Sequence, residues 1–482
     1  MNRPIVRLYG LVILMFALLI GFTSRWAVFS AASLRDNPLN RRSLLAQERI
    51  KRGPILAADG TVLARSVRGS DGLYTRRYPQ HGLFAHAVGY TYIDYGQAGL
   101  EQSYSDYLNG VSQTGLTAIL DQLQGRRPAG DTVNTSLDPS AQRVALSDLG
   151  SQPGAVVALD PHTGAIKVFA SVPGYDPSSG AAGLARLNND PAAPLLDRVT
   201  QSAYPPGSTF KVVTDIAALD SGRFTPASIL NGDSPKVISG VPLENDGNQS
   251  FGPISLTKAL TFSVNTVWAQ VGVQLGKATM AHYMNRLGFD RQPPIDLPSS
   301  EVRASGEYFD VHGQTRLVPP TSPQVDVGRM AFGQDHLEVT PLQMAMVAAS
   351  VANDGVLVAP HLVDTVVNSD GQTVRTNGTQ VIDRAMSTQT AREVGAMMAQ
   401  VVQEGTGTAA ALNGIQVAGK TGTAQTSTPG ESQVWFIAYA PLRDPRYAIA
   451  VTVERSTGQG GTVAAPIARD VLESLLKTGG GD

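Results

Sequence analysis

The sequence predicts an α+β fold with an antiparallel sheet, preceded by a β-rich segment and one membrane-spanning helix. In the second half of the chain, strand-like and helix-like segments come in separate blocks, which is typical of α+β proteins. The chain has 482 residues, 42% of them hydrophobic and 16% charged, so it can bury a large core. It contains no cysteine, which excludes disulfides and cysteine nucleophiles. A net charge of -2 argues against a nucleic-acid binder.

The first expected element is a membrane anchor. Residues 8–24 carry no charge and are bounded by Arg7 and Arg25. Their length is near the lower limit for a helix that crosses a membrane, which requires about 17–25 residues. A cleaved signal peptide is the alternative, but its apolar core is typically shorter. Arginines occur on both sides of the run and do not fix its orientation. We expect a tail and transmembrane anchor over residues 1–28.

Residues 29–150 are expected to form a separate, β-rich pedestal without catalytic residues. Its first part, up to Arg52, is polar and arginine-rich, as in a juxtamembrane stalk. Asp59-Gly60 lies between two apolar runs and predicts a hairpin. Residues 131–137 alternate like a strand, and residues 139–149 have helical spacing. The loop composition that follows places a boundary near residue 150.

The second unit, residues 151–482, is predicted to contain strands from both of its ends and helices between them. Strands are expected at 154–159, 165–171, 415–425, 434–440 and 447–453. Helices are expected at 208–221, 254–275, 341–353, 388–403 and 467–477.

A serine and a lysine at the start of one predicted helix suggest covalent catalysis. In Ser208-Thr-Phe-Lys211 the two side chains are three residues apart, on one helical face. A nucleophilic serine needs a base, and a lysine serves if its pKa is lowered. Pro205-Pro206-Gly207 places Ser208 in the first helical turn, where free backbone N–H groups can stabilise an oxyanion.

Two further motifs follow Ser208 along the chain. Ser263-Val264-Asn265 offers a hydroxyl for proton relay and an amide that can bind a peptide. Lys420-Thr421-Gly422-Thr423 offers a second cation in a strand-like context. Its two hydroxyls can bind a carboxylate, and Gly422 allows a close backbone approach. The order of the three motifs matches the signature of penicillin-binding proteins and class A β-lactamases.

Neither Ser-x-x-Lys nor Lys-Thr-Gly is specific alone, because this chain contains further copies. Ser255 to Lys258 and Ser474 to Lys477 repeat the first, and Lys477 begins a second copy of the other. We interpret Ser255 as a helix N-cap, and Lys477 as a solvated charge near a helix C-terminus.

With these motifs the chain resembles a class B penicillin-binding protein of the short, actinobacterial elongation type. The resemblance extends over nearly the whole length. It implies a penicillin-binding, serine-transpeptidase fold, with an antiparallel sheet flanked by helices and an all-helical subdomain. Further matching segments are Arg52-Gly53-Pro54-Ile55, Gly99-Leu100-Glu101, Leu137-Asp138-Pro139, Gly333-Gln334, Thr340-Pro341-Leu342-Gln343, Trp435-Phe436 and Ala440-Pro441.

The resemblance implies a peptidoglycan D,D-transpeptidase. Ser208 would attack the D-Ala-D-Ala carbonyl of a stem peptide and release the terminal D-Ala. Lys211 would take the serine proton, and Ser263 and Lys420 would relay it to the leaving amine. Asn265 would orient the donor peptide. An amine acceptor from a second stem peptide would then resolve the acyl-enzyme.

For substrate binding, the resemblance implies that Thr421 and Thr423 hold the terminal carboxylate. The backbone N–H groups of Ser208 and Thr423 would form the oxyanion hole. β-Lactam antibiotics would trap the acyl-enzyme, and no metal or other cofactor would be required.

The resemblance also implies a location and a partner. Peptidoglycan precursors lie outside the cell membrane, so the catalytic domain is expected to be extracytoplasmic on a single-pass anchor. A SEDS-family, RodA-like glycosyltransferase in the membrane is the expected protein partner.

Two other functions fit the same motifs. A membrane-anchored D,D-carboxypeptidase would hydrolyse the acyl-enzyme with water. A β-lactam-binding sensor or scaffold would bind without transpeptidase turnover. A class A β-lactamase is rejected because it needs a glutamate after the Ser-x-Asn motif, whereas Glu244 precedes Ser263.

Overall fold

A five-stranded antiparallel sheet lies at the centre of the second unit of this computed structural model, which describes residues 3–24, 49–110, 129–426 and 428–478. Its strand order is β20-β21-β22-β7-β8, so strands from both ends of the unit are adjacent. The strands are β7 (Gly154–Leu159), β8 (Ile166–Val172), β20 (Ala418–Gln425), β21 (Ser432–Ala440) and β22 (Tyr447–Ser456).

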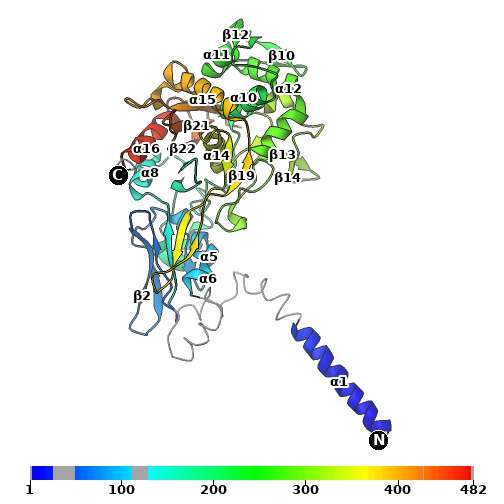
Figure 1. Cartoon of the computed structure of the whole chain (residues 1–482), viewed down its shortest axis with the longest axis vertical. Helices are drawn as coiled ribbons and strands as arrows, with labels where there is room; N and C mark the ends of the chain where they lie inside the picture. Colours follow the sequence, from blue (N-terminus) through cyan, green and yellow to red (C-terminus); the bar gives the residue numbers. More distant parts are fainter. Residues whose placement is uncertain (1–2, 25–48, 111–128, 427, 479–482) are drawn as a thin grey trace.

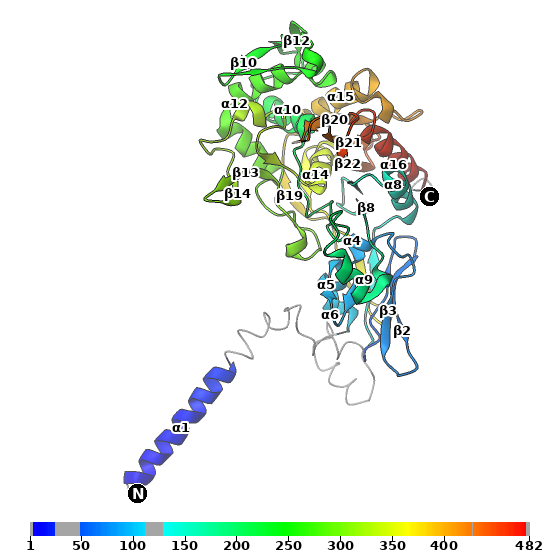
Figure 2. The same cartoon turned by 180° about the vertical axis from the view of Figure 1, so that it is seen from behind.

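Both faces of this sheet are buried. On one face, Val156 and Ala158 of β7 pack in a cluster with α8 (Pro139–Leu149) and α16 (Ala464–Thr478). These two helices are side by side in Figures 1 and 2. On the other face, Ala155 and Val157 pack in a cluster with α14 (Pro341–Ala352), in which every residue is buried. Burial on both sides explains the continuous apolar run of β7.

Capping residues define the ends of several helices. The Asp138 side chain accepts from the backbone N–H groups at the start of α8. Thr340 caps α14 through Gln343 N, and Ser387 caps α15 (Thr388–Gln403) through Thr390 N. These side chains satisfy donors that lack a partner within the helix. The predicted helices at 139–149, 341–353, 388–403 and 467–477 are therefore confirmed, within a few residues at each end.

The region between α10 and α14 contains helices, short β-hairpins and long loops. The prediction of an all-helical subdomain is therefore wrong, because the strands in this region are only two to six residues long and their sequence pattern did not indicate them. The helices are α10 (Lys211–Asp220), α11 (Leu256–Thr261), α12 (Asn265–Arg286) and α13 (Val327–Met330). The strands are β9 (Ile229–Asn231), β10 (Lys236–Ile238), β11 (Val241–Leu243), β12 (Pro253–Ser255), β13 (Gly306–Val311), β14 (Gln314–Val318) and β15 (Leu337–Glu338).

The pedestal contains a six-stranded mixed sheet, in the order β18-β17-β6-β1-β2-β3. β1 and β2 form the hairpin predicted around Asp59-Gly60, and β1 and β6 are parallel. The strands are β1 (Ile55–Leu56), β2 (Val62–Arg68), β3 (Tyr74–Arg77), β6 (Thr132–Thr135), β17 (Val363–Val367) and β18 (Thr373–Thr376). The short elements beside them are α4 (Ala85–Val88), β4 (Thr91–Tyr92), β5 (Gly96–Gln97), α5 (Gly99–Ser103), α6 (Ser105–Leu108) and α9 (Gly180–Leu187).

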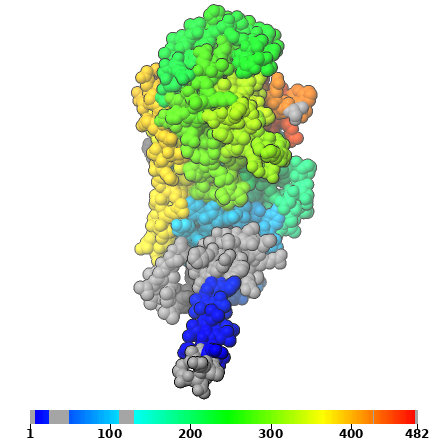
Figure 3. All heavy atoms as spheres, turned by 90° about the vertical axis from the view of Figure 1, so that its right-hand side faces the viewer, coloured from blue at the N-terminus to red at the C-terminus, as the bar shows by residue number. Residues whose placement is uncertain are grey.

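The chain crosses between the two units more than once. α8 lies before residue 150 in the sequence but packs on the central sheet. β17 and β18 lie after residue 150 but complete the pedestal sheet. In Figure 3 the yellow residues, which include β17 and β18, extend down beside the blue and cyan pedestal. β16 (Val356–Val358) precedes β17 and β19 (Val381–Arg384) follows β18 in the sequence, and β16 and β19 pair with each other.

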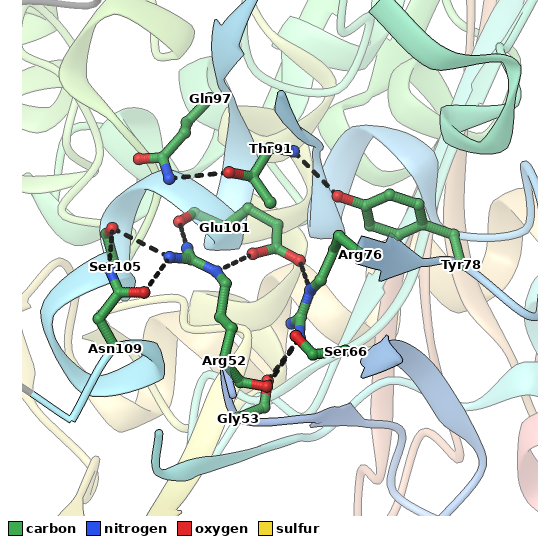
Figure 4. A network of polar contacts seen from close by, with 10 residues as sticks. All are labelled: Arg52, Gly53, Ser66, Arg76, Tyr78, Thr91, Gln97, Glu101, Ser105 and Asn109. Carbon is green, nitrogen blue, oxygen red and sulfur yellow. Dashed lines mark hydrogen bonds and ion pairs between the residues drawn. The ribbon is translucent and has the colours of Figure 1, made fainter. Parts of the chain in front are cut away.

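A buried ion network holds the pedestal elements together (Figure 4). The Glu101 carboxylate accepts from Arg52 Nε at 2.7 Å and from Arg76 Nε at 2.6 Å. Arg52 Nη1 also donates to Asn109 Oδ1 at 2.9 Å, and Arg76 Nη1 donates to Gly53 O at 2.8 Å. Burial would raise the pKa of Glu101, but the charges and hydrogen bonds of both arginines outweigh it and lower that pKa. The carboxylate therefore stays ionised in the folded state.

The N-terminal segment forms the helix α1 (Arg3–Ser24). Among the residues that the structure describes, no helix is both long and apolar enough to cross a membrane. Most of the expected stalk lies outside the described residues.

Candidate active site

Ser208 lies in a short 3₁₀ helix, η3 (Gly207–Phe210), that leads directly into α10. Gly207 has a φ of +51°, and a Cβ there would lie 2.8 Å from Thr423 O. A residue with a side chain would push this segment away from β20. Trp435 Nε1 donates to Pro205 O at 2.9 Å and fixes the segment from the next strand. Ser208 itself is half-buried.

Lys211 is completely buried one turn after Ser208. Its Nζ donates to Ser263 O at 2.7 Å, to Ser263 Oγ at 3.0 Å and to Asn265 Oδ1 at 2.7 Å. Burial, and secondarily the nearby Lys420, lowers the pKa of Lys211 well below its ordinary value, although Asp246 opposes this. A neutral Lys211 can accept the proton of a serine hydroxyl.

Ser263 lies in a break between α11 and α12, inside the helical stretch that the sequence predicted over 254–275. Its φ of +60° is unusual for a residue with a side chain, and it turns the chain between the two helices. Both the carbonyl and the hydroxyl of Ser263 accept from Lys211. Asn265 begins α12, and its Nδ2 donates to Glu244 O at 3.1 Å.

Lys420 reaches the same serine from β20. Its Nζ donates to Ser263 Oγ at 3.1 Å and to Thr421 O at 3.0 Å. The side chain is completely buried, and burial lowers the pKa of Lys420 to about 7. Ser263 Oγ therefore connects two lysines whose pKa values are both lowered by burial.

The residues after Lys420 line β20 beside the Ser208 segment. Thr421 Oγ1 lies 2.6 Å from Thr406 Oγ1, and Thr423 is exposed and accepts from Gly460 N at 3.2 Å. A Cβ at Gly422 would lie 2.8 Å from Pro206 O. The close approach that Gly422 permits in this structure is therefore between β20 and the segment that carries Ser208.

The structure assigns other roles to the repeated motifs. The Ser255 side chain accepts from Lys258 N as the N-cap of α11, as predicted. Lys258 Nζ pairs with Glu404 at 2.6 Å, and both groups are exposed. Lys477 lies in the last turn of α16 and pairs with Glu473 at 2.7 Å. None of these side chains contacts Lys211, Ser263 or Lys420 within the described ranges.

Three residues at the site were not predicted from the sequence. Thr406 lies just after α15, and the two glycines beside it indicate a tight loop but not a functional residue. Asp246 and Gln459 come from opposite sides of the site, and Gln459 Nε2 donates to Asp246 Oδ2 at 3.3 Å. Among the described residues, no group of three or more His, Asp or Glu side chains is arranged to hold a metal ion.

Comparisons with known proteins agree with this fold. Residues 154–473 match the family described as "Penicillin binding protein transpeptidase domain", and residues 52–133 match "Penicillin binding protein A dimerisation domain". The chain is 34% identical to the peptidoglycan D,D-transpeptidase PbpA of Mycolicibacterium smegmatis, over 99% of this chain and 100% of the relative.

Solved structures give the same result. The imipenem acyl-enzyme complex of penicillin-binding protein A from Mycobacterium tuberculosis has a TM-score of 0.80 and 32% identity, covering 90% of this chain and 100% of that chain. A D,D-transpeptidase domain from Eggerthella lenta has a TM-score of 0.79 and 33% identity, covering 90% and 99%. The chain belongs to the penicillin-binding protein transpeptidase family, among the class B, PbpA-like peptidoglycan D,D-transpeptidases.

Proposed function

We propose that this protein, a peptidoglycan D,D-transpeptidase, acts through an acyl-enzyme on Ser208. The observation that carries the proposal is the hydrogen-bonded chain from Lys211 through Ser263 Oγ to Lys420, beside the helix turn of Ser208. Only this copy of the Ser-x-x-Lys motif in the described chain has a second lysine and a serine on the same network. A nucleophile with a base and a proton relay is the arrangement that acyl transfer requires.

Acylation uses the neutral state of Lys211. Ser208 Oγ attacks the carbonyl carbon of the penultimate D-Ala, and its proton passes to Lys211 Nζ. The C–N bond to the terminal D-Ala breaks, and Ser263 with Lys420 delivers a proton to the leaving amine. The backbone N–H groups of Ser208 and Thr423 stabilise the oxyanion.

Donor binding uses groups that surround this relay. Asn265 holds the donor peptide backbone, and Thr421 and Thr423 bind the terminal carboxylate. Deacylation then reverses the roles, since an acceptor amine attacks the ester and Ser208 recovers the proton. This sequence of steps requires no metal or other cofactor.

β-Lactams enter the same pathway as mimics of the donor. The amide of the lactam ring takes the place of the scissile peptide bond, and its opening leaves an ester on Ser208. The M. tuberculosis relative that forms an acyl-enzyme with imipenem supports this assignment.

We further propose the division expected from the sequence, namely an anchor over residues 1–28, a pedestal over 29–150 and a transpeptidase unit over 151–482, except that α8 packs on the transpeptidase sheet and β17 and β18 belong to the pedestal sheet. The large apolar side chains of α1 from Leu8 to Phe22 are at least 43% exposed. Exposure of so many apolar side chains to water is unfavourable, which supports placing this segment in the cell membrane. The substrate lies outside the membrane, so the transpeptidase unit is extracytoplasmic.

The proposed partner of α1 and the pedestal is a SEDS-family glycosyltransferase, which would polymerise the strands that are then cross-linked. A Cβ added at Gly10 or Gly21 would meet no other atom within 4 Å, so α1 is open to another helix at these positions. Replacing α1 with an unrelated spanning helix tests the partner. Co-purification of the glycosyltransferase should fall while penicillin acylation persists. Undiminished co-purification would indicate that α1 only attaches the protein to the membrane and does not bind the glycosyltransferase.

A two-substrate assay tests the function itself. The protein is mixed with a pentapeptide donor and an amine-bearing acceptor peptide, and the products are measured by mass spectrometry. Release of D-Ala together with a cross-linked product is expected, and Ser208→Ala should abolish both. Release of D-Ala with only a hydrolysed tetrapeptide would support the carboxypeptidase alternative. Acylation by penicillin without any turnover of peptide would support the sensor or scaffold alternative.

A further inference from the structure

Asp246 lies on a loop that is rigidly attached to the Ser263–Asn265 motif. The adjacent Asn245 is buried, and its Oδ1 accepts from Thr266 N at 3.0 Å. Asn245 Nδ2 donates to Gly232 O and Gln249 O, so both ends of its amide are fixed. Glu244 O accepts from Asn265 Nδ2 at 3.1 Å. These hydrogen bonds join the loop directly to Asn265 and Thr266.

The Asp246 carboxylate faces the site from this loop. Its charge reaches Lys211, whose protonated form it favours. Across the site, Gln459 Nε2 donates to Asp246 Oδ2 at 3.3 Å, and the neighbouring Gly460 N donates to Thr423 Oγ1. Asp246 is thus linked to Asn265 through the neighbouring Glu244, and to Thr423 through Gln459 and Gly460. Because it is exposed, a ligand can replace the Gln459 amide as its partner.

We propose that Asp246 binds the positively charged amine of the acceptor as it approaches the Ser208 acyl-enzyme. This inference rests on the proposed function. The two substrates differ in charge here, since the donor ends in a carboxylate and the acceptor arrives as an ammonium group. A fixed carboxylate attracts the ammonium and repels a donor that enters in the wrong orientation.

The step that follows needs only groups already present. The ammonium first loses one proton to solvent. Its nitrogen then attacks the ester carbonyl carbon, a C–N bond forms, and the C–O bond to Ser208 breaks. The second nitrogen proton returns to Ser208 Oγ through Lys211. Asp246 does not enter the covalent step and acts as a specificity-determining residue.

The test measures how the acyl-enzyme partitions between amine and water. Full-length protein in detergent is acylated with a benzoyl-D-alanyl thioester, with increasing glycinamide, which is cationic at pH 7, or hydroxylamine, which is uncharged. The ratio of aminolysis to hydrolysis is independent of the rate of acylation, and therefore of changes at Lys211 that alter acyl-enzyme formation. Asp246→Asn should lower this ratio for glycinamide by about two- to fivefold, as expected for one exposed charge pair. The loss should shrink at high salt.

Two controls make the outcome specific. Asp246→Asn should leave the ratio for hydroxylamine unchanged, and Gln459→Leu, which keeps the carboxylate, should retain the wild-type ratio for glycinamide. An unchanged glycinamide ratio in Asp246→Asn overturns the inference, and so does an equal loss in Gln459→Leu. If the wild-type protein transfers to neither amine, the transpeptidase proposal itself fails.

Discussion

Lys211 and Lys420 donate hydrogen bonds to the same atom, Ser263 Oγ, at 3.0 and 3.1 Å. Both lysines are completely buried, so neither charge is compensated by water. Burial lowers both pKa values, and the Lys420 charge lowers the pKa of Lys211 further. The two sites are coupled, so they titrate as a pair and not as independent groups.

The first prediction concerns the pH dependence of acylation. The rate of penicillin acylation should rise with pH as the assigned base, Lys211, loses its proton, and it should level off well below the pH at which an ordinary lysine deprotonates, because burial and the nearby Lys420 lower the pKa of Lys211. Below its lowered pKa, Lys211 is protonated and cannot accept the Ser208 proton, so the rate should fall there by about tenfold per pH unit. Stopped-flow measurements with a chromogenic β-lactam between pH 5 and 9 check this. A rate that still rises about tenfold per pH unit between pH 8 and 9, as for an ordinary lysine, would contradict the assigned base.

The lowered pKa values of Lys211 and Lys420 also predict that the free energy of unfolding rises with pH. An unfolded lysine stays protonated up to about pH 10.4. Folding therefore releases protons above the lowered pKa values, and the free energy of unfolding should rise with pH between about 7 and 10. Replacing Lys420 with methionine should flatten this rise, which denaturant unfolding at several pH values would measure. An unaltered slope in Lys420→Met would show that the lysine is not desolvated.

The two Lys-Thr-Gly copies provide a matched pair of variants. Lys420→Ala removes one end of the relay and should slow acylation by about 10²–10⁴-fold. Lys477→Ala removes an exposed charge that pairs with Glu473, and should change stability by at most about 1 kcal/mol and leave acylation unaffected. The acylation rates of the two purified variants are compared directly. Equal rates would refute the assignment of the relay to Lys420.

The ion pairs of Glu101 with Arg52 and Arg76 should stabilise the pedestal strongly. Glu101→Ala leaves Arg52 and Arg76 buried without a counter-charge, which should cost about 3–5 kcal/mol of stability. The pKa of Glu101 is lowered, so its contribution is present above pH of about 4.5 and lost as pH falls through the lowered value. Thermal unfolding measures the loss, with Glu473→Ala in the exposed pair as control. A similar small effect of both variants would contradict the role given to this network.

Most elements and the central cluster were predictable, because they depend on local patterns. Ser208, Lys211, Ser263, Asn265 and Lys420 were all identified by motif, and the structure brings the last four into one hydrogen-bonded network. A Met- and Ala-rich segment that ends before Asp354-Gly355 indicated α14, and the continuous apolar run of β7 reflects burial on both faces.

What could not be predicted depends on contacts between distant segments. β17 joins β6 across more than 200 residues, and nothing in the local pattern of either strand specifies the other. The Asp246–Gln459 contact spans a similar distance, between two polar loops. The exact position of the break between α11 and α12 could not be predicted, because both helices have apolar spacing and only three residues separate them, of which Ser263 has a positive φ.

The central claim, that Ser208 is the nucleophile, is tested most directly by locating the covalent label left by penicillin. The protein is treated with penicillin G, digested and analysed by tandem mass spectrometry, with Ser208→Ala as control. We predict one penicilloyl group, on the peptide that contains Ser208, and none in the variant. Label on Ser255 or Ser474, or undiminished labelling of Ser208→Ala, would contradict the account.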